Sequence, residues 1–587
     1  MLRRIGLPTL LLLGLLLLAW SAVAWVTGGV SYHGTWIRVS SRDPLRPFLA
    51  GLIGLLLVTR WAGIARVGEE AERISATLAR LSPFGSAIAA LLVGWLGVTY
   101  GTYAASGSDP YGYISQADLW ASGRLSLDFT SLAPLPWGNS EWTLSPLGYR
   151  PGLDPYTIVP TYAPGLPMLM AASALLFGQS AVFLVVPACA ALAVWLTYVL
   201  GRQLYDPLAG LMAAFLLATS PAFLYQTMWP MSDVPVTMFW ILAAVSANRT
   251  TVCTPALSGL AAAAAVIIRP NLVPLAIVPA ILIAGRTASP GYRALVRPLG
   301  LYVAALLPGP VLVAVLNWYW YGAPLKSGYG SFDSLYALAH FWPNARLYAG
   351  WLLETQSPFV LLAVLPFLSQ RWRSETGLLR ELHVRAAIVV FTALLLVSYF
   401  FYLVFEAWWY LRFLLPAFPL MLILASGGLA SRLRRIHAGA EVVMLLVAIP
   451  LIAWMAQVGA SRGIFSLRDF EQRYVRVAGD IADMIPDSAV VISMQHSGSL
   501  RYYADRLTLR YDYLPPRGLD RAVEALVDRG MHPYLLLERW EEPGFIARFA
   551  EWNCRGDLRW QAVRQWQDST TISLYDLTRP DCRKRRR

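Results

Sequence analysis

The chain alternates long apolar runs with short charged segments over its first 460 residues. Runs such as 84–103, 181–200 and 298–316 contain no charged residue, and about 15–22 apolar residues in a row fit a membrane helix. Arg and Lys concentrate in cytoplasmic loops, so the Arg clusters between the runs orient them. The pattern predicts roughly thirteen spans, with the N-terminus in the cytoplasm and the long loop 104–164 outside.

The first two apolar runs precede the main series. The first follows two Arg residues, and Ala22-Val23-Ala24 within it also fits a signal-peptidase site. Cleavage there would leave the later topology unchanged. We predict an additional N-terminal membrane region over residues 1–83, followed by the main membrane domain over residues 84–460. The apolar run 165–178 is short for a span, and we expect it to lie at the membrane interface or to re-enter the membrane.

Beyond residue 460 the pattern becomes that of a soluble domain. Residues 489–493 form a short apolar run typical of a buried strand, and the apolar residues of 520–529 have helical spacing. Alternating strand and helix patterns predict a small α/β domain over residues 461–587. The topology places this domain outside the cytoplasm, where an oxidising compartment would permit a disulfide between Cys554 and Cys582.

Composition supports the membrane interpretation. The chain is 57% hydrophobic and 14% charged, whereas soluble domains carry about 25% charged residues. The net charge of +13 does not indicate nucleic-acid binding, because much of the Arg lies between apolar runs and marks topology. The abundance of Arg and Ala is typical of a high-GC bacterium. We therefore predict a multi-pass protein of the bacterial inner membrane.

Two acidic residues lie at the outer mouths of apolar runs. Asp109 follows the run 84–103 in Gly-Ser-Asp-Pro-Tyr-Gly-Tyr, and Asp233 precedes the run 234–247 in Met-Ser-Asp-Val-Pro. Carboxylates are costly in a membrane, so their positions mark candidate functional sites. Each residue also has a structural interpretation, because Asp-Pro favours a turn and Asp233 can cap the helix that follows it.

Cations and aromatic residues predicted on the same face complete the candidate site. Arg and Lys bind phosphate through charge-assisted hydrogen bonds, although the same residue types also anchor helix ends at lipid headgroups. His340 and His496 lack partners at metal-ligand spacing, so no metal ligand is predicted. The candidate substrate-binding residues are Tyr111, Tyr113, Arg269, Lys326, Tyr329 and Arg412.

Several motifs occur in an order that resembles the GT-C glycosyltransferases. The pattern is most similar to the branch that contains protein O-mannosyltransferases and the aminoarabinose transferase of lipid A (family 39/83-type). The resemblance covers residues 84–429, and it departs from the family where Pro110 replaces the acid that usually follows the first Asp. Besides the Asp109 motif, the matching segments begin at Tyr162 (YAPGLP), Tyr198 (YVLGR), Met231 (MSDVP), Ile268 (IRP) and Arg412 (RFLLP).

The resemblance implies a polytopic all-α membrane domain with Asp109 and Asp233 as catalytic residues. It implies transfer of a hexose or pentose from a polyprenyl-phosphate donor to a glycan, lipid or protein of the cell envelope, with inversion at the sugar. Asp109 would then act as the base, and the cations Arg269, Lys326 and Arg412 would stabilise the departing phosphate. No cofactor is specified, and the need for a divalent cation stays open because of Pro110. The partners would be the donor, the acceptor and membrane lipids, with no nucleic acid.

Two other classes of function stay open. A transporter or flippase of lipid-linked glycans would bind its substrate near the membrane midplane, on charged or broken helices. In this chain the informative charges lie at the outer mouths of nearly charge-free runs. A non-catalytic envelope assembly protein would use the α/β domain as its working part, and it predicts that Asp109→Asn leaves function intact.

Overall fold

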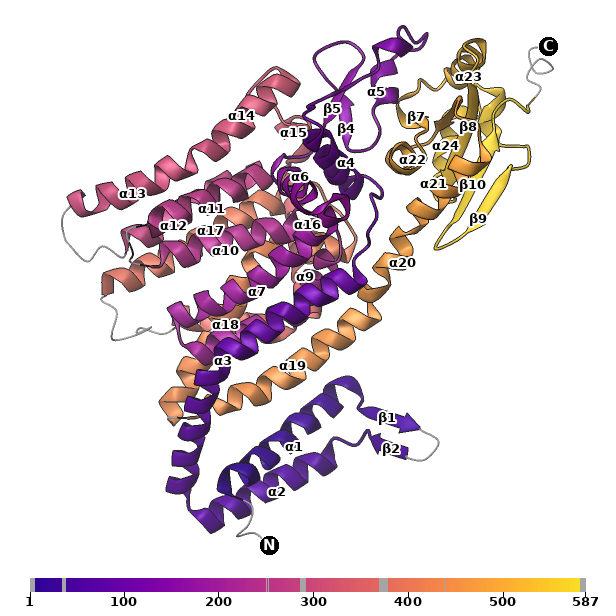
Figure 1. The fold of residues 1–587 in the computed structure, drawn as a ribbon. Coiled ribbons are helices and arrows are strands. Elements are labelled where there is room, and N and C mark those ends of the chain that lie inside the picture. Colours follow the sequence, from indigo (N-terminus) through magenta and orange to yellow (C-terminus); the bar gives the residue numbers. More distant parts are fainter. Residues whose placement is uncertain are drawn as a thin grey trace.

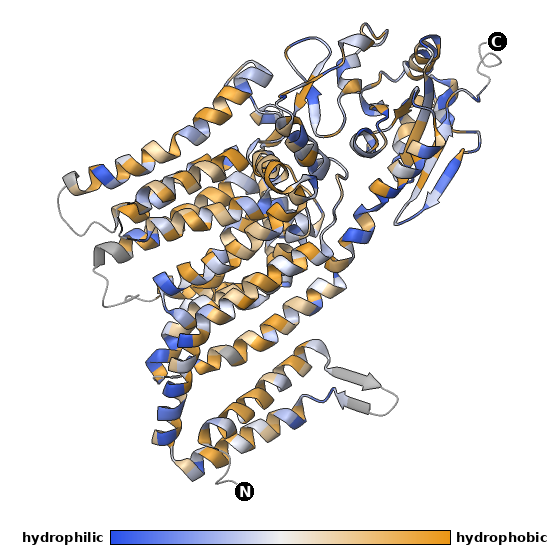
Figure 2. Cartoon of the chain, viewed as in Figure 1, coloured by the Kyte–Doolittle hydropathy of each residue, from blue (hydrophilic) through white to orange (hydrophobic). Residues whose placement is uncertain are grey.

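The structure is a computed structural model that describes residues 6–33, 38–249, 251, 253–285, 292–368, 378–437 and 439–580. A bundle of long helices forms most of the molecule, and a small sheet with its own helices lies beyond one end of the bundle (Figure 1). Hydrophobic residues cover the bundle helices, whereas hydrophilic residues gather on the small domain and on part of α3 (Ile64–Tyr100) (Figure 2).

The helices of the bundle make this a multi-pass membrane protein. Within the described ranges, eight helical segments are long and apolar enough to cross a membrane, or up to ten if each of two bent pairs is one span. The bent pairs are Pro207–Thr219 with Pro221–Thr227, and Leu338–Gln356 with Pro358–Leu368. The eight segments are Leu7–Thr27, Leu45–Ala62, Ile64–Tyr100, Gln179–Leu204, Ala294–Tyr321, Leu382–Phe400, Trp408–Ile436 and Val442–Ser461.

Three shorter apolar helices lie where the sequence predicts further spans. They are α10 (Asp233–Ala247), α11 (Thr254–Ile268) and the segment Pro270–Ala284, formed by η4 and α12. Each is shorter than the 18 residues that the length criterion for a span requires. The count of about thirteen spans therefore stays a prediction, while the multi-pass class is established.

The N-terminal region is a helical hairpin joined to an unusually long helix. In the hairpin, α1 (Leu7–Thr27) and α2 (Leu45–Ala62) pack at close range, because a Cβ on Gly51 would lie 2.9 Å from the carbonyl oxygen of Gly14. The charged link predicted before the third span is itself helical and forms the first part of α3. The two Arg residues that open the chain, Arg3 and Arg4, lie outside the described residues.

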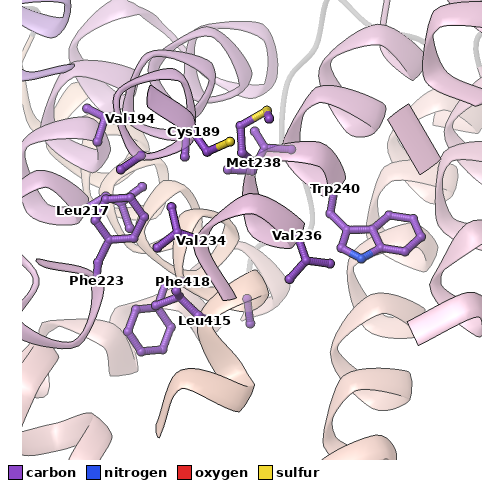
Figure 3. Close-up of a cluster of buried hydrophobic side chains, with 14 of the residues drawn as sticks. Cys189, Val194, Leu217, Phe223, Val234, Val236, Met238, Trp240, Leu415 and Phe418 are labelled. Carbon is purple, nitrogen blue, oxygen red and sulfur yellow. The ribbon is translucent and has the colours of Figure 1, made fainter. Parts of the chain in front are cut away.

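The centre of the bundle is apolar and closely packed. Cys189 of α7 (Val185–Leu204), Leu217 of α8 (Pro207–Thr219) and Val234 of α10 lie together with Phe418 at the start of α18 (Phe418–Ile436) (Figure 3). Val234 is fully buried and directly follows Asp233. Packing of α10 in this core therefore sets the place of the Asp233 carboxylate.

The long loop predicted over residues 104–164 is folded. It contains α4 (Asp109–Ala121), α5 (Ser140–Leu144) and a three-stranded antiparallel sheet in the order β3-β5-β4. The strands are β3 (Leu127–Asp128), β4 (Tyr149–Pro151) and β5 (Thr157–Pro160). The loop leads into α6 (Gly165–Phe177), which has 13 residues and is too short for a span.

The C-terminal part contains a five-stranded sheet in the order β7-β6-β8-β10-β9. β6 (Ala489–Ile492) runs parallel to both β7 (Leu507–Leu509) and β8 (His532–Glu538). β10 (Thr571–Asp576) is antiparallel to β8 and to β9 (Arg564–Gln567). The helices of this part are α20 (Leu467–Glu471), α21 (Arg473–Met484), α22 (Ser497–Tyr503), α23 (Leu519–Asp528) and α24 (Glu542–Phe549).

The cysteines are in two states. Cys189 and Cys253 are free, as expected for positions in and beside the membrane. Cys554 is disulfide-bonded, and Cys582, which the sequence suggests as its partner, lies outside the described residues. The domain boundaries at residues 83 and 460 stay predictions.

Candidate active site

Four charged residues from distant parts of the chain meet at one end of the bundle. Asp109 and Asp233 are the first residues of α4 and α10, and Arg269 directly follows the last residue of α11. A carboxylate at a helix N-terminus and a cation at a C-terminus are both stabilised by the helix dipole. Arg412 lies in the 3₁₀ segment η7 (Trp408–Ala417). Helix ends therefore place three of the four charges.

The four side chains form an alternating chain of charges. Arg412 Nη2 lies 3.0 Å from Asp109 Oδ2, and Arg412 Nη1 lies 3.9 Å from Asp233 Oδ2. Arg269 Nη2 lies 2.6 Å from Asp233 Oδ1. The Asp109 side chain is 28% exposed and that of Asp233 is fully buried. Asp109 is therefore the carboxylate that a ligand can reach.

Hydroxyl groups hold Asp109 and Arg269 in place. Tyr162 Oη donates to Asp109 Oδ1 at 2.6 Å, and burial raises the pKa of Tyr162 well above its ordinary value, so it stays a donor. Tyr113 Oη and Arg269 Nε both donate to Ser232 Oγ, each at 3.1 Å. Ser232 therefore links α4 to the end of α11.

Two glycines permit close approaches that the site needs. A Cβ on Gly112 would lie 2.3 Å from the Tyr162 ring, so a larger residue would push Tyr162 away from Asp109. A Cβ on Gly165 would lie 2.5 Å from the backbone nitrogen of Ile268, next to Arg269. The start of α6 thus packs directly on the end of α11.

Aromatic rings flank both guanidinium groups. Arg412 Cζ lies 5.1 Å from the Tyr410 ring centroid and 5.3 Å from that of Phe413, while Arg269 Cζ lies 5.7 Å from Phe413. Arg269 Nη1 also donates to Tyr399 Oη at 3.1 Å. These cation–π contacts hold each guanidinium plane in a fixed orientation.

Several of these supporting residues are not among the sequence predictions for the site. Tyr162 and Phe413 do stand inside the motifs at 162 and 412, which was the available signal. Ser232 also stands inside a motif, because it directly precedes Asp233 in MSDVP. Tyr399 lies in an apolar run, where an aromatic residue looks like an ordinary interfacial anchor.

The other predicted residues lie around the cluster. Tyr111 is buried and faces the C-terminal domain, because a Cβ on Gly498 would lie 2.3 Å from its ring. Tyr329 is 46% exposed, and its ring lies edge-on to Tyr162 at 5.8 Å. Lys326 is exposed, and among the described contacts it has none with the four charged residues.

The two acids could ligate a divalent cation only by giving up their guanidinium partners. Mg²⁺ and Ca²⁺ take six or more oxygen ligands, mostly from carboxylates, carbonyls and water. Both Asp109 and Asp233 are bound to guanidinium groups. Among the described residues, no group of three or more His, Cys, Asp and Glu side chains is placed to hold a metal.

The fold of the bundle is similar to that of solved GT-C membrane glycosyltransferases, in agreement with the resemblance seen in the sequence. The fold is similar to ArnT from Cupriavidus metallidurans in the apo state, with a TM-score of 0.52 and 12% identity, covering 83% of this chain and 97% of that one. The ArnT structure bound to undecaprenyl phosphate gives a TM-score of 0.50 and 11% identity, with the same coverage.

Two further comparisons give matches. Residues 148–317 match the family model of the oligosaccharyl transferase STT3, N-terminal region. An apo oligosaccharyltransferase from Archaeoglobus fulgidus matches 80% of this chain and 71% of its own, at 14% identity and a TM-score of 0.47. The comparison with curated proteins finds no match.

Proposed function

We propose that this protein is a glycosyltransferase of the bacterial inner membrane. It transfers a sugar from a polyprenyl-phosphate donor to a hydroxyl of a cell-envelope glycan, lipid or protein outside the cytoplasm. The observation that carries the proposal is the convergence of Asp109, Asp233, Arg269 and Arg412 at the outer end of the bundle. The ArnT structure with undecaprenyl phosphate supports a lipid phosphate as the leaving group.

The proposed reaction is a single displacement. The acceptor oxygen attacks the anomeric carbon of the sugar, and the bond from that carbon to the phosphate oxygen breaks. The acceptor proton passes to Asp109, and the bonding electron pair leaves with the lipid phosphate. Arg412 and Arg269 stabilise the charge that develops on this phosphate, since a guanidinium contacts phosphate through two parallel hydrogen bonds. One displacement inverts the anomeric centre.

The ion pair between Arg412 and Asp109 implies that donor binding precedes proton transfer. A donor phosphate competes with Asp109 for the Arg412 guanidinium, 3.0 Å away. When Arg412 turns to the phosphate, the released Asp109 oxygen is free to accept the acceptor proton. Asp233 is fully buried and stays paired with Arg269, so it assists catalysis by holding the second cation in place.

Two of the remaining predicted residues, Tyr113 and Tyr329, lie beside the cluster. Tyr113 donates to Ser232 within the cluster, and burial raises the pKa of Tyr113 to about 12, so its hydroxyl stays protonated. Tyr329 packs on Tyr162 beside the cluster. We assign Tyr113 and Tyr329 to sugar contact, and Lys326, on the same external segment as Tyr329, to the rim.

The test is sugar transfer by purified protein in lipid nanodiscs, with a panel of polyprenyl-phosphate sugars. Asp109→Asn should lower kcat about a hundredfold or more, the usual contribution of a general base. Asp118→Asn is the matched control, because Asp118 lies on the same helix but accepts a hydrogen bond from Gln179. It should keep wild-type turnover.

Other outcomes would reject the proposal. Wild-type turnover by Asp109→Asn would remove Asp109 as the base. Movement of intact donor across the bilayer without release of lipid phosphate would identify a flippase. No transfer and no movement with any donor would favour an assembly role.

A further inference from the structure

The C-terminal sheet lies against the segment that carries Asp109. Beyond the carboxyl end of β6 the chain passes Gln495 and enters α22, which packs on α4 through the close contact between Gly498 and Tyr111. In open α/β sheets, ligands bind beside the carboxyl ends of the strands. Here a part of the loop 104–164 occupies this position, because the Leu147 N–H donates to Ser497 Oγ at the start of α22.

Side chains of the C-terminal part bind the backbone of residues 102–105. Gln472 Nε2 donates to the Thr102 carbonyl oxygen at 2.7 Å. The Ala105 N–H donates to Tyr503 Oη, also at 2.7 Å. These contacts join residues that are 370 and 398 positions apart in the chain. The segment between α3 and Asp109 is thus anchored by side chains of the C-terminal part.

Ser106 is the key contact, because it joins this anchor to the helix of Asp109. Its hydroxyl donates to the carboxylate of Glu471, at the end of α20. Its carbonyl oxygen accepts from the Tyr111 N–H at 3.2 Å, at the start of α4. Ser106 is fully buried, and the Glu471 side chain is 6% exposed. A shift of Glu471 would therefore move the first turn of α4, which begins with Asp109.

A second layer holds Glu471 itself. Arg473 Nη1 lies 3.9 Å from Glu471 Oε1, and Arg473 Nε donates to Glu538 Oε1 at 3.0 Å. His496 Nε2 contacts the same Glu538 oxygen at 3.1 Å. The Glu471 carboxyl is withdrawn from water, and this burial raises its pKa. The layer gives Glu471 a fixed place within a packed network.

We propose that Glu471, acting through Ser106, is a positioning residue that sets Asp109 against Arg412 and Tyr162. The C-terminal domain is then a structural part of the active site. The inference rests on the proposed function, because it takes Asp109 as the base in sugar transfer.

The kinetic test is a double-mutant cycle in nanodiscs. Glu471→Ala and Ser106→Ala should each lower kcat about tenfold or more, because a displacement of about 1 Å can cost a hundredfold in rate. The KM for the donor should stay within about twofold, since donor-binding cations are untouched. The double variant should be no slower than the slower single variant. Glu471→Gln should keep most of the activity, because its amide oxygen still accepts from Ser106.

The matched control is Asp568→Asn. Asp568 pairs with Arg476 of α21 on the surface of the same domain, and its loss should leave kcat unchanged. Wild-type kcat in both alanine variants would overturn the proposal, and so would fully additive losses in the cycle. If Glu471→Ala does not fold, Ser106→Ala carries the test, since it removes a single oxygen atom.

A second measurement separates this inference from the proposed function. Hydrogen exchange of the full-length protein should show faster exchange of the Tyr111 and Gly112 N–H groups in Ser106→Ala, by about tenfold. These groups bond to the carbonyl oxygens of Ser106 and Ser108. Unchanged exchange would overturn the proposal. Faster exchange in a protein that transfers no sugar would uphold the positioning role and reject the proposed function.

Discussion

Two buried clusters of opposite charges among the described residues differ in access to solvent. In the membrane cluster the Asp109 side chain is 28% exposed. In the C-terminal cluster of Glu471, Arg473, Glu538 and His496, every side chain is 6% exposed or less. Burial of ion pairs is costly and brings little net stability. The sealed cluster can hold its surroundings in place, whereas the open one can also exchange a protein partner for a ligand.

The clusters also differ in how their charges are supported. The membrane cluster uses helix ends and aromatic rings around a linear chain of two acids and two cations. In the C-terminal cluster Arg473 is shared between Glu471 and Glu538, and its Cζ lies 4.3 Å from the Tyr474 ring centroid. Substitution of a single charged residue in each cluster should therefore test whether the exposure of its side chain determines how much that residue contributes to stability and to activity.

The largest effect is expected for Asp233→Ala. The change leaves Arg269 without its carboxylate partner in a buried site, and breaking such a pair costs about 3–5 kcal/mol of stability. Thermal unfolding in nanodiscs should show the loss. Asp109→Ala is the comparison, and it should destabilise less because Asp109 is partly exposed and Arg412 keeps Asp233 nearby. Equal losses would mean that exposure does not distinguish the two acids.

A nearly equal loss is expected for Arg473→Met in the sealed cluster. Glu471 and Glu538 would lose their shared cation, at a cost of about 3–5 kcal/mol, reduced because His496 still contacts Glu538. Arg476→Met on the same helix is the control. Its partner Asp568 lies at the surface, so the loss should stay below about 1 kcal/mol. A larger loss of stability in Arg476→Met would mean that substitutions in helix α21 destabilise the protein whether or not they break the buried cluster.

The charges of the membrane cluster could be predicted from the sequence because three of them stand near the ends of apolar runs. Asp109, Asp233 and Arg269 stand at such ends, and Arg412 stands in a recognisable motif. The topology predicted from the Arg clusters puts all four residues on one face of the membrane, and in the structure their side chains meet. Tyr399 could not be predicted, since its contact with Arg269 spans 130 positions and leaves no local pattern.

The role of Glu471 had no signal in the sequence. In Leu-Arg-Asp-Phe-Glu it looks like one acid on a solvated helix, and its burial depends on the docking of the C-terminal part on residues 102–106. The membrane helices were easier to predict than the role of Glu471, because an apolar run is visible in the composition alone. The sequence could not show that the charged link before the third span is helical and continuous with α3. Helix-forming residues are common in such links whether or not they fold as a helix.

A smaller effect is expected for the pH dependence of the C-terminal part. Burial raises the pKa of Glu541 from 4.5 to about 7. The unfolded chain releases this proton near pH 4.5, whereas the folded chain keeps it, so stability falls as pH rises from about 4.5 to 7. The fall amounts to about 3 kcal/mol or less. Glu541→Gln should remove it, as seen by thermal unfolding at pH 5 and pH 8.

Glu538 gives the opposite sign and serves as the comparison. Burial alone would raise its pKa, but His496 and Arg473 outweigh this and lower it to about 2. Its contribution is therefore complete above about pH 4.5 and is lost only as the pH falls towards 2. Glu538 does not titrate between pH 5 and pH 8. An unchanged pH slope in Glu541→Gln would show that another group causes it.

The smallest effect is expected for Arg412→Lys, which keeps the charge and changes only its geometry. Lys lacks the planar fork that contacts phosphate through two hydrogen bonds and that lies over the rings of Tyr410 and Phe413. The KM for a polyprenyl-phosphate sugar should rise about tenfold, which corresponds to about 1.4 kcal/mol. Arg346→Lys, at an exposed position of α16 (Phe341–Gln356), should leave the KM unchanged. If Arg412→Lys also leaves it unchanged, Arg412 serves only to balance Asp109 and Asp233, and the open cluster would then work like the sealed one.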